Sequence, residues 1–368
     1  MASALPPPID PTRATPMTAD EMPWKDSEPY LWYDAEGLTL AGKGWPTESK
    51  RYQRFPSRAE GKIPPGPWRL SLACAGLSLR FHSDAPFFFI RTVDFDGRPN
   101  IAQISHNSPS LYVRRHGRWQ WLGLDHPAVE GSAVHKLVNG AMPRGLREYL
   151  LYLPLGRGMT KLELAIPADC KLIPALPRTE KPIVFYGTSI NHGGNASRPG
   201  TNHVARVERH FDYPTINLGL SGNGRMEPEV VDLVNEIDAR LFVVDCLPNM
   251  QAPEVRERFA PCIQQLRAGH PDVPIVVVDN VIYQDGFLVT DRYERYTKSN
   301  AAQQEEFAKL VAAGVPNLHY VHARELFTDE VEATVDGTHP NDLGFKLMAE
   351  ALIKAIAPFM PGAEGPAR

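Results

Sequence analysis

Two kinds of hydrophobic pattern follow one another along the chain, and they meet near residue 178. In the first part, short apolar runs are separated by Gly, Pro, Asp and Asn at spacings typical of hairpins, and no helical stripe intervenes. This pattern predicts an antiparallel β-sandwich of jelly-roll type. The expected strands cover 68–73, 77–81, 87–93, 111–113, 119–121, 149–153 and 162–166.

In the second part, strand-like apolar runs alternate with helical patterns. The runs lie at 183–186, 215–218, 241–244, 274–278 and 318–321, and the helical patterns lie near 201–211, 227–237, 252–269, 293–313 and 342–357. Nearly continuous apolar strands separated by helices are typical of a parallel sheet that is covered on both faces. We therefore expect an α/β fold with a flavodoxin-like, doubly wound, five-stranded parallel sheet, which binds its ligand beyond the carboxyl ends of the strands.

The two patterns predict four segments. Residues 1–24 are rich in Pro, Ala and Thr and are expected to form a flexible tail, and 361–368 resemble them. The sandwich is expected to span 25–178 and the α/β domain 179–360.

Charge and composition argue against several classes of partner. The 368 residues carry a formal net charge of −4 with an isoelectric point near 6.3, and no basic run indicates a nucleic-acid surface. No stretch approaches the ~18 apolar residues of a membrane span, and no signal peptide is visible. A cytoplasmic protein is expected, or a secreted one if a signal has been removed. The four cysteines show no metal-type spacing.

Three residues offer the parts of a nucleophilic site. Ser189 follows the first α/β strand in a Gly-containing turn, and a hydroxyl becomes a good nucleophile only beside a base. His339 precedes Pro340, which keeps it on a loop before the last helix. Asp336, three residues earlier, can accept the Nδ1–H of His339. The alternative interpretation is a plain turn at Ser189 and a capping role for Asp336.

Acyl transfer also needs donors where negative charge develops on the carbonyl oxygen. The main-chain N–H of Ser189, the Gly222 backbone after the second strand and the amide of Asn249 after the third are candidates. Gly222 as an ordinary βα turn and Asn249 as a helix cap are the alternatives.

Weaker candidates lie nearby. Arg198 would line the mouth of the site or hold its own loop, and Asp245 would bind substrate, order the Asn249 loop or simply end a strand. His192 and His203 lack the spacing of a metal site, and no phosphate-binding loop is present, so neither a metal site nor phosphate binding is expected from these residues.

These segments, in this order, resemble the SGNH/GDSL hydrolase superfamily, which is named for its Ser, Gly, Asn and His. The family blocks correspond to Ser189, Gly222, Asn249 and the Asp336/His339 pair, and the resemblance covers about 181–358. Four longer stretches of sequence lie at 187–190, 196–200, 217–222 and 245–250. They are similar to the corresponding stretches of a bacterial branch of the family whose members carry an N-terminal β-sandwich, as some carbohydrate acetylesterases do.

The chain departs from the family pattern in three places. Thr188 replaces the Asp of Gly-Asp-Ser, and the string 245–249 replaces Gly-x-Asn-Asp. In the sandwich, 108–112 reads Ser-Pro-Ser-Leu-Tyr where relatives often carry Gly-x-Asp-Leu-Tyr.

The resemblance implies a two-step ester hydrolysis without metal or cofactor. Ser189 would attack the acyl carbon, His339 would take its proton, and Ser189, Gly222 and Asn249 would hold the oxyanion. We expect a serine esterase that removes short acyl groups, above all acetyl, from a small-molecule or saccharide ester. An acyltransferase using the same triad and a non-catalytic glycan-binding protein are the alternatives.

Overall fold

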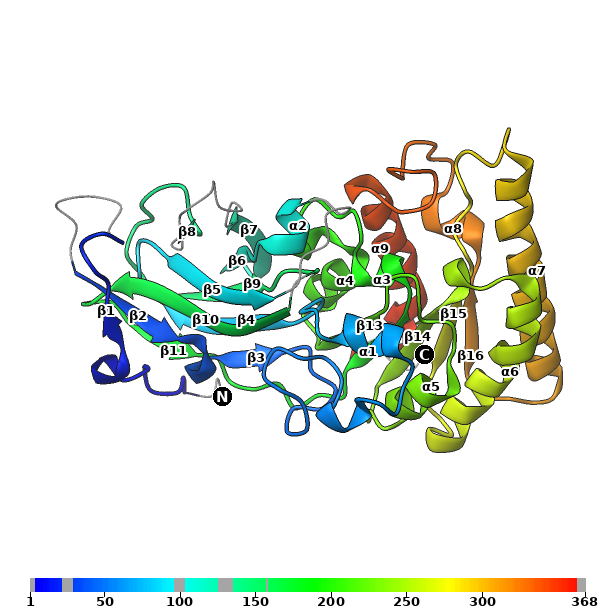
Figure 1. The fold of residues 1–368 in the computed structure, drawn as a ribbon, viewed down its shortest axis with the longest axis horizontal. Helices are drawn as coiled ribbons and strands as arrows, with labels where there is room; N and C mark the ends of the chain where they lie inside the picture. The colour runs from blue at the N-terminus through cyan, green and yellow to red at the C-terminus, as the bar shows by residue number, and fades with distance from the viewer. Residues whose placement is uncertain (1–3, 22–28, 96–102, 125–134, 157, 363–368) are drawn as a thin grey trace.

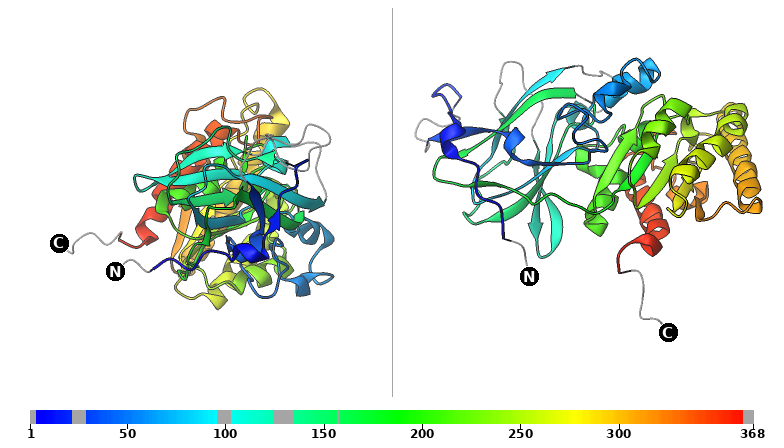
Figure 2. Two further views of the ribbon diagram at one scale, coloured as in Figure 1. Left: turned by 90° about the vertical axis from the view of Figure 1, so that its left-hand side faces the viewer. Right: turned by 90° about the horizontal axis from the view of Figure 1, so that it is seen from below.

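The protein consists of two parts that lie side by side along its long axis (Figures 1 and 2). The computed structural model describes residues 4–21, 29–95, 103–124, 135–156 and 158–362. Most of the expected C-terminal tail, 363–368, therefore lies outside the described residues, as do 1–3 and 22–24 of the expected N-terminal tail.

Two antiparallel sheets form the first part, as the sequence predicted. One sheet has the order β1 (Thr15–Pro16), β2 (Tyr30–Asp34), β10 (Gly158–Pro167), β5 (Phe89–Phe95) and β8 (His135–Lys136). The other has the order β11 (Leu172–Pro174), β4 (Ser78–Ser83), β9 (Arg147–Tyr152), β6 (Ser110–Arg115) and β7 (Arg118–Leu124), with β3 (Thr39–Ala41) also paired to β4. Buried aromatic rings such as Phe81, Phe88 and Tyr149 pack in its core.

Two sequence expectations for this part are wrong. The segment expected to be a strand at 68–73 forms helix α1 (Pro65–Ser71), and α2 (Gln103–Asn107) is a second helix in the part where none was expected. In α1, Pro65 occupies the first turn, and Pro67, Leu70 and Ser71 are the buried residues, at the spacing of a helix face. Within the segment 1–24, β1 pairs with β2 and Met17 is buried, and the extent of the flexible tail stays a prediction.

The second part contains the parallel sheet that the apolar runs predicted. Its order is β13 (Thr215–Gly219), β12 (Ile183–Gly187), β14 (Leu241–Asp245), β15 (Ile275–Val278) and β16 (Leu318–Val321), and every pairing is parallel. One face packs against α5 (Pro228–Asn235), α6 (Ala252–Gly269) and α7 (Thr290–Ala312). The other packs against α3 (Ser189–His192), α4 (His203–Phe211), α8 (Ala323–Phe327) and α9 (Asp342–Ile356).

Residues that precede most of the sandwich strands also contribute to the core of the second part. Trp45, Phe55 and Leu70 are buried in the same cluster as β13 and β14. Arg54, only 1% exposed, donates to the main-chain oxygens of Asn217 and Gly219 at 3.0 and 2.9 Å. The domain boundary at 178 stays a prediction, but this packing crosses it.

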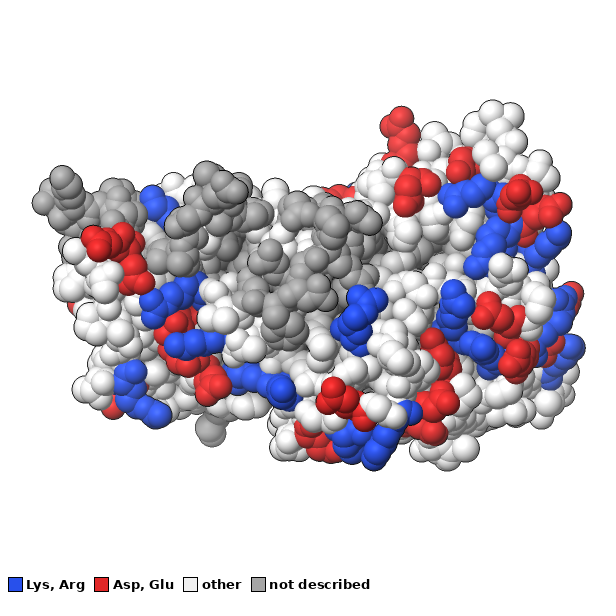
Figure 3. Space-filling view, in the orientation of Figure 1, with Lys and Arg blue, Asp and Glu red and all other residues white. Residues whose placement is uncertain are grey.

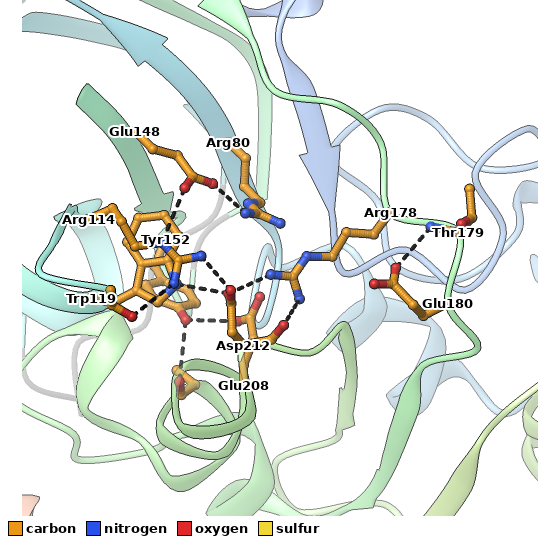
Figure 4. A network of polar contacts seen from close by, with 12 residues as sticks. Arg80, Arg114, Trp119, Glu148, Tyr152, Arg178, Thr179, Glu180, Glu208 and Asp212 are labelled. Atoms are coloured by element: carbon orange, nitrogen blue, oxygen red, sulfur yellow. Dashed lines mark hydrogen bonds and ion pairs between the residues drawn. The ribbon is translucent and has the colours of Figure 1, made fainter. Parts of the chain in front are cut away.

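A polar network fastens the sandwich to α4 (Figure 4). Arg114, Trp119 and Arg178 converge on the carboxylate of Asp212, which follows α4. The Trp119 Nε1 and Arg178 Nη2 atoms lie 3.1 and 2.6 Å from it. The two parts are therefore joined by charged contacts as well as by apolar packing.

Charges of both signs are interspersed on the face shown in Figure 3. None of the helices in the described ranges combines the length and the apolar character that a bilayer-spanning segment requires.

Candidate active site

The candidate residues are brought to the carboxyl edge of the parallel sheet. Ser189 comes directly after β12, Gly222 follows β13, and Asn249 ends the 3-10 turn η5 (Leu247–Asn249) that follows β14. Asp336 and His339 lie on the loop that precedes α9. Segments distant in sequence meet here because the carboxyl ends of parallel strands lie at one edge of a sheet.

Ser189 occupies a tight strand-to-helix turn that requires glycine before it. A Cβ atom on Gly187 would lie 2.4 Å from Asn191 Nδ2 and 2.5 Å from the main-chain oxygen of Asp245. Thr188 caps α3, and its hydroxyl accepts the Ile190 N–H at 3.4 Å. Thr188 and Ile190 are buried whereas Ser189 is only half-buried, so the turn presents the serine at the sheet edge.

Ser189, His339 and Asp336 form a continuous chain of hydrogen bonds. Ser189 Oγ lies 2.8 Å from His339 Nε2, across 150 positions of sequence. His339 Nδ1 lies 2.7 Å from Asp336 Oδ2. When Nδ1 carries the hydrogen that it donates to Asp336, Nε2 is free to accept the serine proton. The side chains that the sequence predicted as nucleophile, base and acid are therefore in contact in that order.

The Asp336 carboxylate is stabilised by its own loop. Its Oδ1 accepts the N–H groups of His339 and Thr338 at 2.7 and 3.0 Å. Burial raises the pKa of Asp336, but these bonds and the one from the His339 ring together hold that pKa below its ordinary value. An ionised carboxylate at this position can stabilise the imidazolium that forms when His339 takes a proton.

The three N–H groups that the sequence predicted as oxyanion donors each keep a hydrogen for which the described chain offers no recorded acceptor. Within the described ranges, the main-chain N–H groups of Ser189 and Gly222 donate no hydrogen bond to the chain. The Asn249 amide donates one hydrogen to the main-chain oxygen of Asn223 at 2.6 Å, which leaves its second hydrogen for a ligand.

The loop after β13 needs two glycines. Gly222 and Gly224 have φ of +72° and +68°, in the left-handed region that favours glycine. A Cβ on Gly222 would meet nothing within 4 Å, whereas one on Gly224 would lie 2.1 Å from the Gly187 oxygen. Gly222 therefore borders open space, and Gly224 packs against the strand that leads to Ser189.

Arg198 and Asp245 have different surroundings. Arg198 reaches from the loop after α3 to the sandwich, where its Nη1 donates to the Tyr112 hydroxyl at 2.5 Å. Its guanidinium carbon is 5.0 Å from the centre of the Trp121 ring, which is 48% exposed. Asp245 is 2% exposed, and burial raises its pKa well above the ordinary value. Its carboxyl therefore lies inside the fold, beside the sheet, and not on an open surface.

Two residues with a role in this geometry were not identified from the sequence. Asp342 accepts the Ser197 N–H and the Thr201 hydroxyl at 2.9 and 2.8 Å, and so ties the loop after Ser189 to the helix after His339. Asn223 holds the Asn249 amide through its main-chain oxygen. Asp342 is the first residue of α9, where an acidic side chain is common because it is favourable at a helix N-terminus. The local sequence therefore does not indicate that its partners are Ser197 and Thr201.

The two other histidines considered as metal ligands have partners inside the fold. His192 Nε2 lies 2.6 Å from the main-chain oxygen of Leu155, and His203 Nε2 lies 2.8 Å from Asn191 Oδ1. Burial lowers the pKa of His203 to about 3. Among the residues that the structure describes, no group of three His, Cys, Asp or Glu side chains is arranged to hold a metal ion.

Comparison with known families matches both parts of the chain. Residues 180–357 match the GDSL-like lipase/acylhydrolase family, and residues 30–172 match the N-terminal domain of SGNH-hydrolase-type esterases. No curated protein matches the sequence.

Solved structures share the two-part fold. A protein of Bacteroides ovatus ATCC 8483 described as a GDSL-like lipase is 34% identical, with a TM-score of 0.83, over 90% of this chain and 98% of its own. The salicylyl-acyltransferase SsfX3 of a tetracycline biosynthetic pathway is 18% identical, with a TM-score of 0.71, over 92% of this chain and 98% of its own. A family two carbohydrate esterase of Cellvibrio japonicus is 11% identical, with a TM-score of 0.58, over 91% and 99%. The last two likenesses concern the fold alone. On the two family matches and the 34% identity, the chain belongs to the GDSL-like lipase/acylhydrolase family and is an SGNH-type ester hydrolase.

Proposed function

We propose that the protein is a serine esterase that removes short acyl groups, most simply acetyl, from a carbohydrate. The observation that carries the proposal is the chain of contacts from Ser189 Oγ to His339 Nε2 at 2.8 Å and from His339 Nδ1 to Asp336 Oδ2 at 2.7 Å. A nucleophile, a base and an acid in this arrangement are what acyl transfer requires.

The reaction proceeds in two steps. Ser189 Oγ attacks the acyl carbon while His339 takes its proton, and the charge on the carbonyl oxygen is held by the N–H groups of Ser189 and Gly222 and by the Asn249 amide. The bond to the alcohol breaks, and His339 returns the proton to the leaving oxygen. Water, deprotonated by His339, then attacks the acyl carbon. The bond from that carbon to Ser189 Oγ breaks, His339 returns the proton to Oγ, and the acid is released.

A saccharide as the alcohol part is supported by the surface that the sandwich offers. The Trp121 ring, in β7, is 48% exposed and lies beside the guanidinium of Arg198. Arg198 is on the loop that follows the nucleophile. An exposed indole with an adjacent guanidinium suits stacking on a sugar ring and hydrogen bonding to its hydroxyl groups. Family two carbohydrate esterases have the same fold.

Hydrolysis of p-nitrophenyl esters from acetyl to octanoyl tests the activity. The wild type is expected to prefer the shortest acyl chains, and Ser189→Ala is expected to lose the activity. Ser57→Ala, which removes an exposed hydroxyl, is the matched control and should behave as the wild type. Ester hydrolysis by Ser189→Ala at the wild-type rate would contradict the assignment. Release of acetate from an acetylated xylo-oligosaccharide then tests the substrate class, and Trp121→Ala should raise KM for it more than for p-nitrophenyl acetate.

The fold shared with a salicylyl-acyltransferase calls for one further measurement. A sugar acceptor added to the p-nitrophenyl acetate assay should leave the yield of free acetate unchanged if water is the acceptor. Formation of a new sugar ester at the expense of acetate would make the protein an acyltransferase.

A further inference from the structure

Helix α7 begins beside two catalytic loops and sends an arginine to each. Arg292 and Arg295 are three residues apart, so they lie on one face of the helix. α7 is the long helix at the right edge of the molecule in Figure 1. Neither arginine contributes an atom to the triad or the oxyanion site.

Arg292 holds the loop of the acid and the base. Its Nη2 donates to the Thr338 hydroxyl at 2.7 Å and to the main-chain oxygen of Asp336 at 3.3 Å. Its Nε donates to both carboxylate oxygens of Asp285, at 2.9 and 2.8 Å. The guanidinium is thus fixed on one side by Asp285 and fastens the segment between Asp336 and His339 on the other.

Arg295 holds the loop of the oxyanion amide. Its two terminal nitrogens donate to the main-chain oxygens of Pro248, at 3.1 Å, and of Met250. These two residues flank Asn249. Among the described residues no ion pair is recorded for Arg295, neither with Glu294, which pairs with Lys298, nor with Asp291 one turn earlier. The contacts recorded for Arg295 are therefore those to the Asn249 loop.

The helix that carries both arginines is itself fastened to the sheet. Asn300 donates to the Asn280 oxygen at 3.0 Å and accepts its N–H at 2.9 Å, just after β15. Gln303 Nε2 donates to the Val278 oxygen at 3.0 Å. A rigid element with two planar guanidinium groups can therefore set the distance between two loops that do not belong to it. A positive charge in the first turn opposes the helix dipole, so Arg292 is unfavourable for the helix itself, which agrees with a role elsewhere.

We propose that Arg292 and Arg295 are positioning residues: the start of α7 fixes the acid–base pair and the oxyanion amide at the separation that the transition state needs. The inference rests on the proposed function of Ser189, His339 and Asn249. Arg292 acts through Asp336 and His339, and Arg295 acts through Asn249.

Double-mutant cycles test this division. Arg292→Met and Arg295→Met should each lower kcat for p-nitrophenyl acetate by roughly 10- to 100-fold with little change in KM, because misplaced groups fail mainly in the transition state. In an Asn249→Ala background, Arg295→Met should add less than about twofold, while Arg292→Met keeps its full effect. In an Asp336→Ala background, Arg292→Met should add less than about twofold, while Arg295→Met should keep its full effect. Arg295→Lys, which can still bond one carbonyl, should recover part of the rate.

Lys298→Met is the matched control, since it removes a cation from the same helix whose recorded partner is the exposed Glu294. It should leave kcat unchanged in all backgrounds. If the reductions in kcat caused by Arg295→Met and Asn249→Ala multiply in the double mutant, the inference is wrong. It is also wrong if the loss of rate is fully explained by a smaller fraction of folded protein. In either case, loss of activity in Ser189→Ala would still support the esterase assignment. Wild-type activity in Ser189→Ala, run alongside, would overturn both.

Discussion

Side chains at the candidate site are oriented by hydrogen bonds to main-chain groups as well as by hydrogen bonds to one another. Asp336 accepts two N–H groups from its own loop, and the Asn249 amide is oriented by the Asn223 oxygen. The sequence could predict Asp336 and His339 as a pair because they are three residues apart in a loop. It could not predict Asp342, Arg292 or Arg295, because their partners are distant in sequence and no local pattern records them.

Asp336→Asn is expected to lower kcat by at least about 10²-fold, because an amide cannot stabilise the imidazolium as a carboxylate does. The lowered pKa of Asp336 keeps the wild-type carboxylate ionised below its ordinary range. A fall in kcat/KM on acidification that occurs above about pH 4 is therefore not caused by protonation of Asp336. Steady-state kinetics from about pH 4 to pH 9 check both statements, and a mutant with wild-type kcat would contradict the role of the acid.

At the scale of elements, strands with continuous apolar sequence were predictable and short elements in mixed surroundings were not. The five strands of the parallel sheet appear where the apolar runs placed them, because β-branched and aromatic residues buried on both faces leave little alternative. Helix α1 was missed because Trp68, Leu70 and Leu72 alternate with polar residues as in a strand. Its actual face is chosen by distant packing, since Leu70 enters the core of the other part.

The loop after β13 offers a matched pair of substitutions. Gly222→Ala meets open space and suffers only from its positive φ, which should cost about 1 kcal/mol of stability. Gly224→Ala adds a Cβ 2.1 Å from the Gly187 oxygen, and the displaced strand end should raise the cost to about 2–4 kcal/mol. Denaturant unfolding gives the stabilities and p-nitrophenyl acetate hydrolysis gives the rates. Equal effects of the two substitutions would show that Gly187 does not restrain this loop.

For the whole molecule, an important feature is that the two parts are fastened at several separate places. The Asp212 network joins the sandwich to α4 (Figure 4), and Arg54 joins the segment before α1 to β13. Sequence patterns predicted the two architectures but not the contacts between them. The sequence around Arg54 does not distinguish a buried arginine from an exposed one, because its acceptors in β13 are distant in sequence.

Asp212 connects this fastening to pH. Burial raises its pKa, but the bonds from Arg114 and Trp119 and the charge of Arg178 lower it to about 2. Because the folded-state pKa is depressed, its contribution is complete above about pH 4 and is lost as the pH falls towards 2. Asp212→Asn should therefore reduce the free energy of unfolding at neutral pH by about 1–2 kcal/mol, allowing for solvent screening of a partly exposed group.

The difference between Asp212→Asn and the wild type should shrink in acid, which urea unfolding at about pH 7 and about pH 3 can measure. Asp169→Asn is the control, since that carboxylate is 63% exposed in its pair with Arg144 and should matter little. A difference that stays constant between the two pH values would mean that the ionised Asp212 does not stabilise the fold.

A fragment that begins at residue 179 is expected not to fold stably. It would lack Trp45, Phe55 and Leu70 from the core of the parallel sheet, and the oxygens of Asn217 and Gly219 would lose Arg54. We expect a broad thermal transition by circular dichroism and no esterase activity. A cooperative transition with wild-type activity would instead establish the predicted boundary as an independent folding limit.

The path of the chain through residues 45–70 also bears on how such proteins can be recombined. A crossover at the linker near 178 would leave one parent's sheet covered by another parent's Trp45 and Arg54, in a cavity shaped for different neighbours. A stable hybrid therefore requires parents whose residues at 45–70 and in the parallel sheet are compatible in packing. We expect the sandwich and the sheet to be inherited together in natural proteins for the same reason.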